Sequence, residues 1–309
     1  MHLKLRDLAV FHAVMLTGSV SKAAERLGLT QPAVSMALSK LEERLGYPLF
    51  NRSRGNFYAR PEALLLHEDA EMAILAFERF SSHAQLIGRG AEGLVRVGSI
   101  GSTAIHFLPE MIARFAATRS SVEIELQVRS SMQLVTYVGN GQTDIGLTES
   151  PVASDLVEAV NVAIPCVCIM RDTDPLAAEP LITPQHLADR KLVSVFEEHQ
   201  MDRALRAAFE DAGVPFRSTI RCYFFAIMRN LVAKSAGVAI VDAINGCAEA
   251  HDGVTWRPFL PRLTFDVAVI TRKDTGLTAP AREFLDLTVA GLRAVDAQVD
   301  AAEARARAS

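Results

Sequence analysis

Hydrophobic residues in the first 45 positions recur at the spacing of an amphipathic helix in three short segments. The repeats are Leu8, Phe11 and Met15, then Ala23, Ala24 and Leu27, and finally Val34, Leu38, Leu41 and Leu45. Steps of three and four residues place each group on one helix face. Ser19 and Thr30 stand where the second and third helices need an N-cap, and Gly46 stands where the third needs a left-handed residue. The pattern predicts a small three-helix bundle.

A change of pattern after Gly46 predicts a short hairpin. In the segment YPLFNRSRGNFYAR, residues 47–60, aromatic and apolar residues flank an Arg-Gly turn.

A long amphipathic helix is predicted from Pro61 onwards. Its apolar positions step alternately by four and three residues: Leu66, Ala70, Ala73, Phe77, Phe80, Ala84 and Ile87. A period of 3.5 residues is typical of a coiled-coil seam and favours a partner helix, while packing along its own domain is the alternative. The candidate dimerisation residues are Leu66, Ala73, Phe77, Phe80 and Ile87.

From Leu94 the pattern changes to short strand-like runs alternating with helices, which predicts an α/β body. Strands are expected at 94–100, 122–128, 143–148, 167–170, 192–196, 237–241 and 265–271, and helices near 104–118, 201–212, 224–235 and 280–294. Two crossover strands near 160–165 and 260–266 would join two lobes and leave a cleft between them.

Composition and charge narrow the class of protein. Of the 309 residues, 50% are hydrophobic and 22% charged, as in a globular protein. No run approaches the ~20 apolar residues of a membrane helix, and the start lacks a signal-peptide cleavage region, so a cytoplasmic protein is expected. Residues 1–60 carry nine Lys and Arg against four Asp and Glu, or +5, whereas residues 61–309 carry 23 against 32, or −9. A basic N-terminal head (residues 1–60) followed by an acidic body (residues 61–309) predicts that the head binds a polyanion. Chance clustering of charge is the alternative.

Cysteine and histidine offer no recognisable site. The four cysteines are too scattered for a disulfide framework, and the eight histidines lack the spacing of metal ligands. No nucleophile, nucleotide-binding or dinucleotide-binding motif occurs in a suitable setting. We therefore expect no metal, no cofactor and no enzymatic activity.

The segment RLGLTQPAVSMALSKLEERLG, residues 26–46, joins two predicted helices through a tight turn. This spacing predicts a helix-turn-helix, in which the third helix presents its first residues to the major groove of DNA. Gln31 can pair with adenine, and Ser35 can serve a base or a phosphate. An ordinary helical hairpin is the alternative.

Residues 11–52, FHAVMLTGSVSKAAERLGLTQPAVSMALSKLEERLGYPLFNR, resemble the winged helix-turn-helix of the LysR-type transcriptional regulators. The order of head, long helix and α/β body extends this resemblance over nearly the whole chain. It implies an α/β protein with an N-terminal all-α winged helix-turn-helix (1–60), a linker helix (61–90) and a two-lobed, periplasmic-binding-protein-like effector domain (91–309). Lobe I would comprise about 91–163 and 265–300, and lobe II about 164–264.

The resemblance also implies partners. The expected assembly is a homodimer or homotetramer that binds an interrupted palindrome in double-stranded DNA and responds to a small-molecule effector in the interlobe cleft. FHAVMLTGS, DIGLTE and GVAIVD are most similar to regulators of amino-acid or opine metabolism. Met36, Arg60 and Ala63 depart from the family's usual residues in the recognition helix and at the start of the linker helix.

Candidate site residues follow from the motif and the resemblance. The DNA-binding candidates are Ser21, Thr30, Gln31, Pro32, Ser35, Lys40, Arg52 and Arg54, where the two wing arginines could otherwise form a merely exposed turn. The effector-binding candidates are Ser99, Ser102, Thr103, Ser130, Thr148, Glu198 and Asp242.

The types of side chain predict how an effector would be held. Hydroxyl groups at a helix start in lobe I suit a carboxylate, and the acids Glu197, Glu198 and Asp242 of lobe II suit a cationic group. These features predict an amino acid or amino-acid derivative, unless the acids only face water. The rival interpretation of the whole chain is an α/β binding protein or enzyme whose head serves assembly alone.

Overall fold

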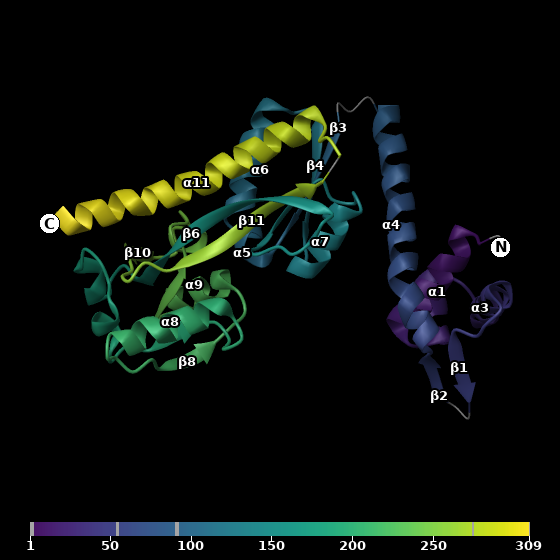
Figure 1. Ribbon diagram of the computed structural model, residues 1–309, viewed down its shortest axis with the longest axis horizontal. Coiled ribbons are helices and arrows are strands. Elements are labelled where there is room, and N and C mark those ends of the chain that lie inside the picture. Colours follow the sequence, from purple (N-terminus) through teal and green to yellow (C-terminus); the bar gives the residue numbers. More distant parts are fainter. Residues whose placement is uncertain (1–2, 54–55, 90–92, 274, 309) are drawn as a thin grey trace. The chain divides into compact units, whose positions relative to one another are not determined.

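The computed structural model describes residues 3–53, 56–89, 93–273 and 275–308. The chain divides into two compact units, residues 1–90 and 91–309, which we describe separately (Figure 1).

The N-terminal unit begins with helices α1 (Leu5–Thr17), α2 (Val20–Leu27) and α3 (Gln31–Leu45). Each ends at a glycine in the left-handed conformation, Gly18, Gly28 and Gly46, with φ of 61°, 63° and 82°. The Ser19 hydroxyl caps α2 by accepting the Lys22 amide, as expected. Thr30 stands at the N-cap of α3, but its hydroxyl makes no capping bond. The three predicted helices are therefore confirmed, each with its predicted apolar face inward.

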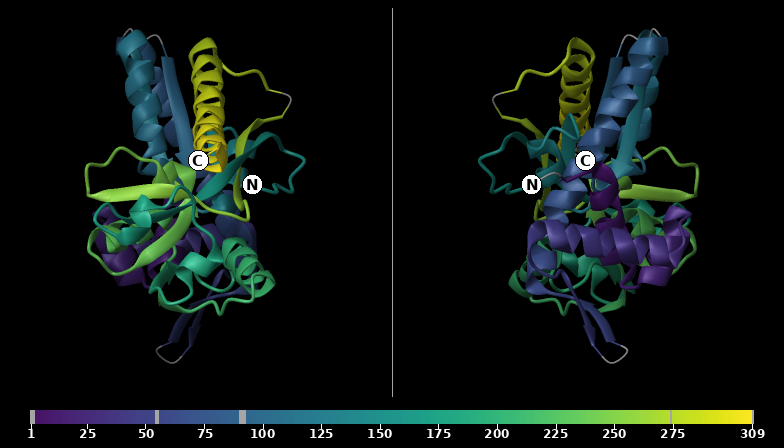
Figure 2. Two further views of the ribbon diagram at one scale, coloured as in Figure 1. Left: turned by 90° about the vertical axis from the view of Figure 1, so that its left-hand side faces the viewer. Right: turned by 90° about the vertical axis from the view of Figure 1, so that its right-hand side faces the viewer.

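The predicted hairpin follows α3 as strands β1 (Phe50–Ser53) and β2 (Asn56–Ala59), which pair in antiparallel register. Figure 2 shows the hairpin projecting from the helices of this unit as a wing. Phe50 anchors it, because its ring stacks on Phe57 at 4.9 Å and meets Phe11 edge-on at 6.1 Å. The base of the wing is thereby part of the head's hydrophobic core.

Helix α4 (Pro61–Arg89) completes the N-terminal unit. Its first turns pack on the head, where Ala63 and Ala70 are fully buried and Leu66 is half-buried. Further along, Ala73, Phe77 and Phe80 are exposed. The predicted heptad seam thus has two parts, of which only the second faces away from its own head.

The C-terminal unit is built on one sheet of the strands β3 to β11 within the described residues, in the order β4-β3-β5-β11-β6-β9-β7-β8, with β10 also paired to β6. Their bounds are β3 Gly93–Ser99, β4 Val122–Val128, β5 Ile145–Glu149, β6 Val157–Arg171, β7 Leu192–Ser194, β8 Ser218–Arg221, β9 Val238–Asp242, β10 Val254–Pro258 and β11 Thr264–Arg272. Parallel strands β3, β4 and β5 form one end and parallel strands β7, β8 and β9 the other, joined through antiparallel β6 and β11.

Helices cover both ends of this sheet. They are α5 (Gly101–Ala104), α6 (Phe107–Thr118), α7 (Ser131–Gly139), α8 (Gln200–Asp211), α9 (Phe225–Ala233), α10 (Ala243–Gly246) and α11 (Ala279–Ala308), with 3₁₀ turns at Pro175–Ala178 and Pro184–Leu187. Helix α11 lies beside α6 (Figures 1 and 2). One hydrophobic core runs through both ends of the sheet.

Several elements differ from the sequence pattern. The strand expected at 167–170 and the crossover near 160–165 are one continuous strand, β6. Of the crossover strand expected near 260–266, residues 260–263 form a loop and residues 264–266 begin β11, and helix α11 continues to Ala308 instead of ending near 294. Helix α7 and the edge strands β8 and β10 have no counterpart in the prediction. None of the described helices is both long and apolar enough to cross a membrane.

Candidate functional site

The outer face of α3 is the first candidate site. Val34, Leu38 and Leu41 are buried on its inner face, which fixes the orientation of the helix. Gln31 and Pro32 are exposed at its N-terminal tip, and Ser35 is half-buried one turn on. Residues reach bases from this end of a recognition helix. Packing of the apolar face of α3 into the core therefore leaves the predicted recognition residues together at the N-terminal end of the helix.

The other predicted DNA contacts lie on α2, on α3 and in the wing. Thr30 is exposed with its hydroxyl free of a capping bond, while Ser21 on α2 and Lys40 on α3 are exposed as well. Met36, the residue that departs from the family pattern, is 57% exposed on the same helix. Arg52 lies in β1 opposite Phe57, and Arg54 lies outside the described residues.

Glu42 is a residue of this site that the sequence pattern did not reveal. Its carboxylate accepts the backbone N–H groups of Leu49 and Phe50 at 2.8 and 3.1 Å. Two backbone donors at the start of the wing are thus held by a side chain of α3. The pattern gives no signal for this role, because a glutamate late in a helix is usually solvated.

The exposed part of α4 is the second candidate site. Phe77 and Phe80 are 51% and 69% exposed, which is unusual for phenylalanine in a folded monomer. The described residues also expose Leu64 and Leu65 on the first turn, which the heptad pattern did not single out. Leu66 packs against its own head instead, and the side chain of Ile87 lies outside the described residues.

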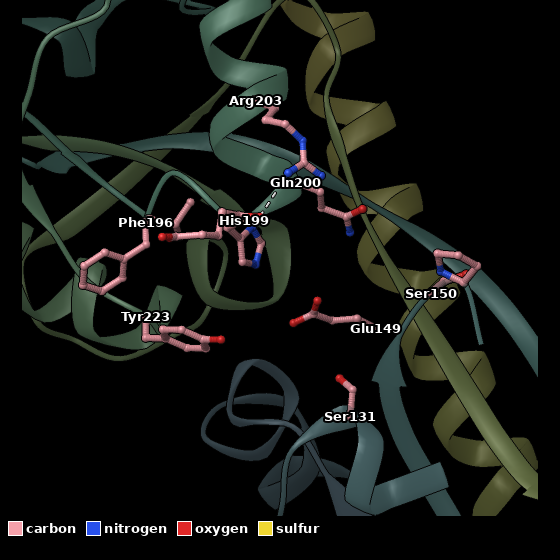
Figure 3. Close-up of a pocket in the computed structure, with 11 residues that line it drawn as sticks. Ser131, Glu149, Ser150, Phe196, His199, Gln200, Arg203 and Tyr223 are labelled. Atoms are coloured by element: carbon pink, nitrogen blue, oxygen red, sulfur yellow. Dashed lines mark hydrogen bonds between the residues drawn. The ribbon is translucent and has the colours of Figure 1, made fainter. Parts of the chain in front are cut away.

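A cavity of about 420 Å³ in the C-terminal unit is the third candidate site (Figure 3). One end of the sheet contributes Ser131, Glu149, Ser150 and Pro151, and the other contributes Val195, Phe196, Glu198, His199, Gln200, Arg203 and Tyr223. The first group follows β4 and β5, while the second follows β7 and β8. Ligands of open α/β sheets bind beyond the carboxyl ends of parallel strands, where these residues lie.

Three of the predicted effector residues lie in or beside this cavity. Glu198 lines it directly. Ser130 immediately precedes the lining residue Ser131 and caps α7, where its hydroxyl accepts the Gln133 amide. Thr148 immediately precedes Glu149 but is fully buried, and its hydroxyl finds no hydrogen-bond partner in the described part of the chain.

The other four, Ser99, Ser102, Thr103 and Asp242, do not line this cavity. The hydroxyls of Ser99 and Thr103 bond to each other at 2.6 Å in the buried core. Ser102 donates to the Asp242 carboxylate at 3.4 Å, and the Asn245 amide donates to both Asp242 and the Ser102 carbonyl. These residues differ from expectation because their polar atoms bond to other protein groups: Ser99 and Thr103 to each other, and Ser102 and Asp242 across the two ends of the unit.

Burial has a strong effect on Asp242. The side chain is fully buried, and loss of hydration raises its carboxyl pKa to about 6 despite hydrogen bonds from Asn245 and Ser102. The nearby start of α5 is also covered, since a Cβ placed on Gly101 would lie 2.8 Å from the Phe224 ring. The Phe224 side chain therefore occupies the position at the start of α5 where the sequence predicted a bound anion.

His199 lies at the centre of the cavity lining. Its Nδ1 accepts the Met201 amide at the start of α8, and its ring packs against Phe225 and Phe265. Burial lowers the pKa of the imidazole. The charge of Arg203 lowers this pKa further, whereas the charge of Glu149 raises it. Burial thus favours the neutral ring, and its contacts fix it with its free edge directed into the cavity (Figure 3).

Glu149, Arg203 and Tyr223 also line the cavity, although the sequence pattern did not identify them. Glu149 directly follows the predicted strand TDIGLT and is the last residue of β5. Its position at the end of a strand could therefore have identified it as a site residue from the sequence. Arg203 and Tyr223 gave no comparable signal, because their role depends on how the two ends of the sheet face each other. Glu197, expected to face a ligand, pairs with Arg206 and Arg221.

Two family matches cover most of the chain. Residues 5–61 match the bacterial regulatory helix-turn-helix proteins of the lysR family, and residues 88–293 match the LysR substrate binding domain. The chain therefore belongs to the LysR family of bacterial regulatory proteins.

Individual relatives agree with this assignment. The transcriptional activator protein LysR of Escherichia coli is 25% identical over 300 residues, 96% of each chain. The octopine catabolism/uptake operon regulatory protein OccR of Rhizobium meliloti is 27% identical over 257 residues, 83% of this chain and 85% of OccR. These relatives are transcriptional regulators and not enzymes.

The fold also matches a solved LysR-family structure. The crystal structure of CbnR aligns with a TM-score of 0.74 at 18% identity, covering 94% of this chain and 99% of CbnR. The predicted fold class, a helix-turn-helix head followed by a two-lobed α/β effector domain, is confirmed.

Proposed function

We propose that residues 1–60 bind an interrupted palindrome in double-stranded DNA, that residues 61–90 dimerise the chain, and that residues 91–309 bind the effector. The DNA contacts would come from Gln31, Pro32 and Ser35 on α3, supported by Ser21, Thr30 and Lys40. Arg52 and Arg54 on the wing would contact phosphates or the minor groove. The exposed polar tip of α3, held in place by its buried apolar face, is the observation that carries this proposal.

The net charge of +5 on residues 1–60 also supports DNA as the partner. A head that served assembly alone would have no need of this charge. A solved structure of full-length CbnR is a complex with its target DNA, and it aligns with a TM-score of 0.71 at 19% identity over 95% of this chain and all of CbnR. We place the protein in the cytoplasm, where it would meet its operator.

A gel-shift competition tests the DNA-binding proposal. Labelled DNA from upstream of the gene should be retained by the full-length protein in the presence of excess unrelated DNA, and retention should fall steeply as salt is raised. Equal competition by specific and unrelated DNA would contradict sequence recognition, and no retention at low salt would contradict DNA binding altogether.

We further propose that the cavity in the C-terminal unit binds an amino acid or amino-acid derivative and that this binding regulates the DNA-bound oligomer. The name of OccR connects that relative with octopine, an amino-acid derivative. The lining of carboxylates, a guanidinium and an imidazole suits a small ligand with charges of both signs. Addition of the effector should change the footprint of the full-length protein on its operator, whereas an unchanged footprint would contradict regulation by that compound.

A further inference from the structure

The cavity in the C-terminal unit has a distinctive set of charges. It is lined by two carboxylates, Glu149 and Glu198, and by one guanidinium, Arg203. Neither glutamate side chain has a hydrogen-bond or ion-pair partner among the described residues. A ligand that complements this lining carries one anionic group and more cationic charge than anionic.

Glu149 is the carboxylate best placed to hold a cation. It is half-buried at the end of β5, and Figure 3 shows its carboxylate directed into the space that His199 and Tyr223 face from the opposite side. A partly desolvated carboxylate gains most from a cationic partner, because water compensates its charge less well.

Arg203 and His199 are the two lining side chains best suited to an anion. Arg203 donates from Nη1 to the Glu198 backbone carbonyl at 3.1 Å, which orients the guanidinium without neutralising its charge. His199 accepts the Met201 amide at Nδ1, so the proton of its neutral imidazole resides on Nε2. Each of these side chains therefore keeps a hydrogen-bond donor for a carboxylate.

Aromatic side chains complete the lining near Glu198. The rings of Phe196 and Tyr223 lie 6.2 Å apart, and both are substantially exposed. Such faces accept an alkyl stem or a flat cationic group. A second cationic group at the far end of a ligand would thus meet both aromatic surface and the Glu198 carboxylate.

This geometry reverses the orientation of the ligand that was expected from the sequence, with its carboxylate in lobe I and its cationic group in lobe II. The lobe I hydroxyls expected to hold a carboxylate are buried in protein contacts, while Glu197 is already paired with two arginines. The available anion-binding groups lie after β7, and the half-buried acid Glu149 is the last residue of β5.

Resting on the proposed function of this cavity, we propose that its effector is a basic α-amino acid, or a derivative that keeps a free carboxylate and two cationic groups. The carboxylate binds Arg203 and His199. One cationic group binds Glu149, and the second extends towards Glu198 and the aromatic pair.

Calorimetry on the full-length protein tests this assignment with three probes: L-arginine, agmatine, which lacks the carboxylate, and glutarate, which lacks the cations. Wild type should bind L-arginine more tightly than either of the others. Arg203→Met should lower the affinity for L-arginine roughly tenfold, which corresponds to the loss of one charge-assisted hydrogen bond. The affinity for agmatine should stay nearly unchanged. Glu149→Gln should weaken both cationic probes.

Matched variants separate local recognition from loss of fold. Glu123→Gln on β4 and Arg217→Met after α8 remove the same charges at exposed positions outside the cavity and should leave binding unchanged. Glu149→Asp retains the carboxylate and should restore part of the affinity lost in Glu149→Gln. Unaltered circular dichroism is required of each variant.

The possible failures are distinguishable. Glutarate binding more tightly than L-arginine, weakened by Arg203→Met and not by Glu149→Gln, would overturn the basic amino acid and leave an effector cavity in place. Failure of L-arginine to bind up to millimolar concentration would also overturn it. Binding of any probe that no cavity variant alters would contradict the location of the effector site itself.

Discussion

Glu42 couples the recognition helix to the wing through two backbone hydrogen bonds. Its carboxylate accepts the amides of Leu49 and Phe50, and Phe50 in turn anchors the hairpin to the head's core. Glu42 and the Phe50 ring therefore both hold the wing against the head.

Glu42→Ala should loosen the wing without unfolding the bundle. Loss of an acceptor for two amides costs about 1–3 kcal/mol. Hydrogen exchange at the Leu49 and Phe50 amides should accelerate accordingly, whereas the exposed neighbour variant Glu43→Ala should leave it unchanged. Equal protection in wild type and Glu42→Ala would show that the wing is held by other contacts.

Asp242 gives the C-terminal unit a defined pH dependence. Burial raises the pKa of this carboxyl from 3.8 to about 6, so the folded state binds its proton more tightly than the unfolded chain does. Its contribution to stability is therefore complete below about pH 4 and lost as the pH rises through about 6.

Comparison with Asp242→Asn isolates this contribution, because the asparagine variant cannot titrate at this position. As the pH falls from about 8 to about 5, wild type should gain about 1.4 kcal/mol of stability relative to the variant, because about one pH unit of this interval lies below the folded-state pKa. Urea unfolding of the C-terminal unit at several pH values measures the difference. A pH-independent difference would contradict the raised pKa.

At the scale of elements, α4 combines two interfaces along one heptad pattern. Its first turns pack on the head through Ala63 and Ala70, and its later turns expose Phe77 and Phe80. The seam available to a second copy therefore begins near Ala73.

A charge at Phe80 should separate the dimer, since an aspartate would be buried unpaired between two helices. Ala76→Asp is the matched control, because residue 76 is exposed and is not one of the apolar positions of the heptad seam. Sedimentation should show monomers for Phe80→Asp and dimers for Ala76→Asp. An intact dimer in Phe80→Asp would mean that the exposed phenylalanines are not the interface.

Elements with a repeated apolar pattern could be predicted from the sequence, and elements defined by pairing could not. Helices α1 to α4 and strand β4 follow directly from the spacing of their hydrophobic residues. Strand β6 was divided in prediction because its first half is largely exposed and its second half is buried, so no single pattern spans it. Edge strands β8 and β10 are short, and their partners are distant in sequence.

The same distinction holds for the sites. The tip of α3 could be predicted because one helix carries it. The cavity lining required knowledge of how loops after β5, β7 and β8 meet, which is why Arg203 and Tyr223 were missed. Ser102 and Asp242 were expected at a ligand but bond to each other, because hydroxyls and acids satisfy one another equally well across a closed contact.

At the scale of the whole molecule, opposite charges are divided between the two ends of the chain, +5 on residues 1–60 and −9 on the rest. Replacing Arg52 or Arg54 by glutamine should weaken binding to all DNA sequences alike and lower the salt slope by about one unit each. Binding measured over a range of salt concentrations gives the slope, and an unchanged slope would exclude phosphate contacts from the wing.

The most direct test of the account is the base preference of Gln31→Ala, measured by binding the full-length protein to a library of operator variants. Gln31 is exposed at the tip of α3, where an amide side chain can read a base edge. We predict a loss of roughly 1–3 kcal/mol confined to particular base positions. The control variant Gln127→Ala, exposed on β4, should keep the wild-type profile. A Gln31→Ala profile identical to that of wild type would contradict the assignment of α3 as the recognition helix.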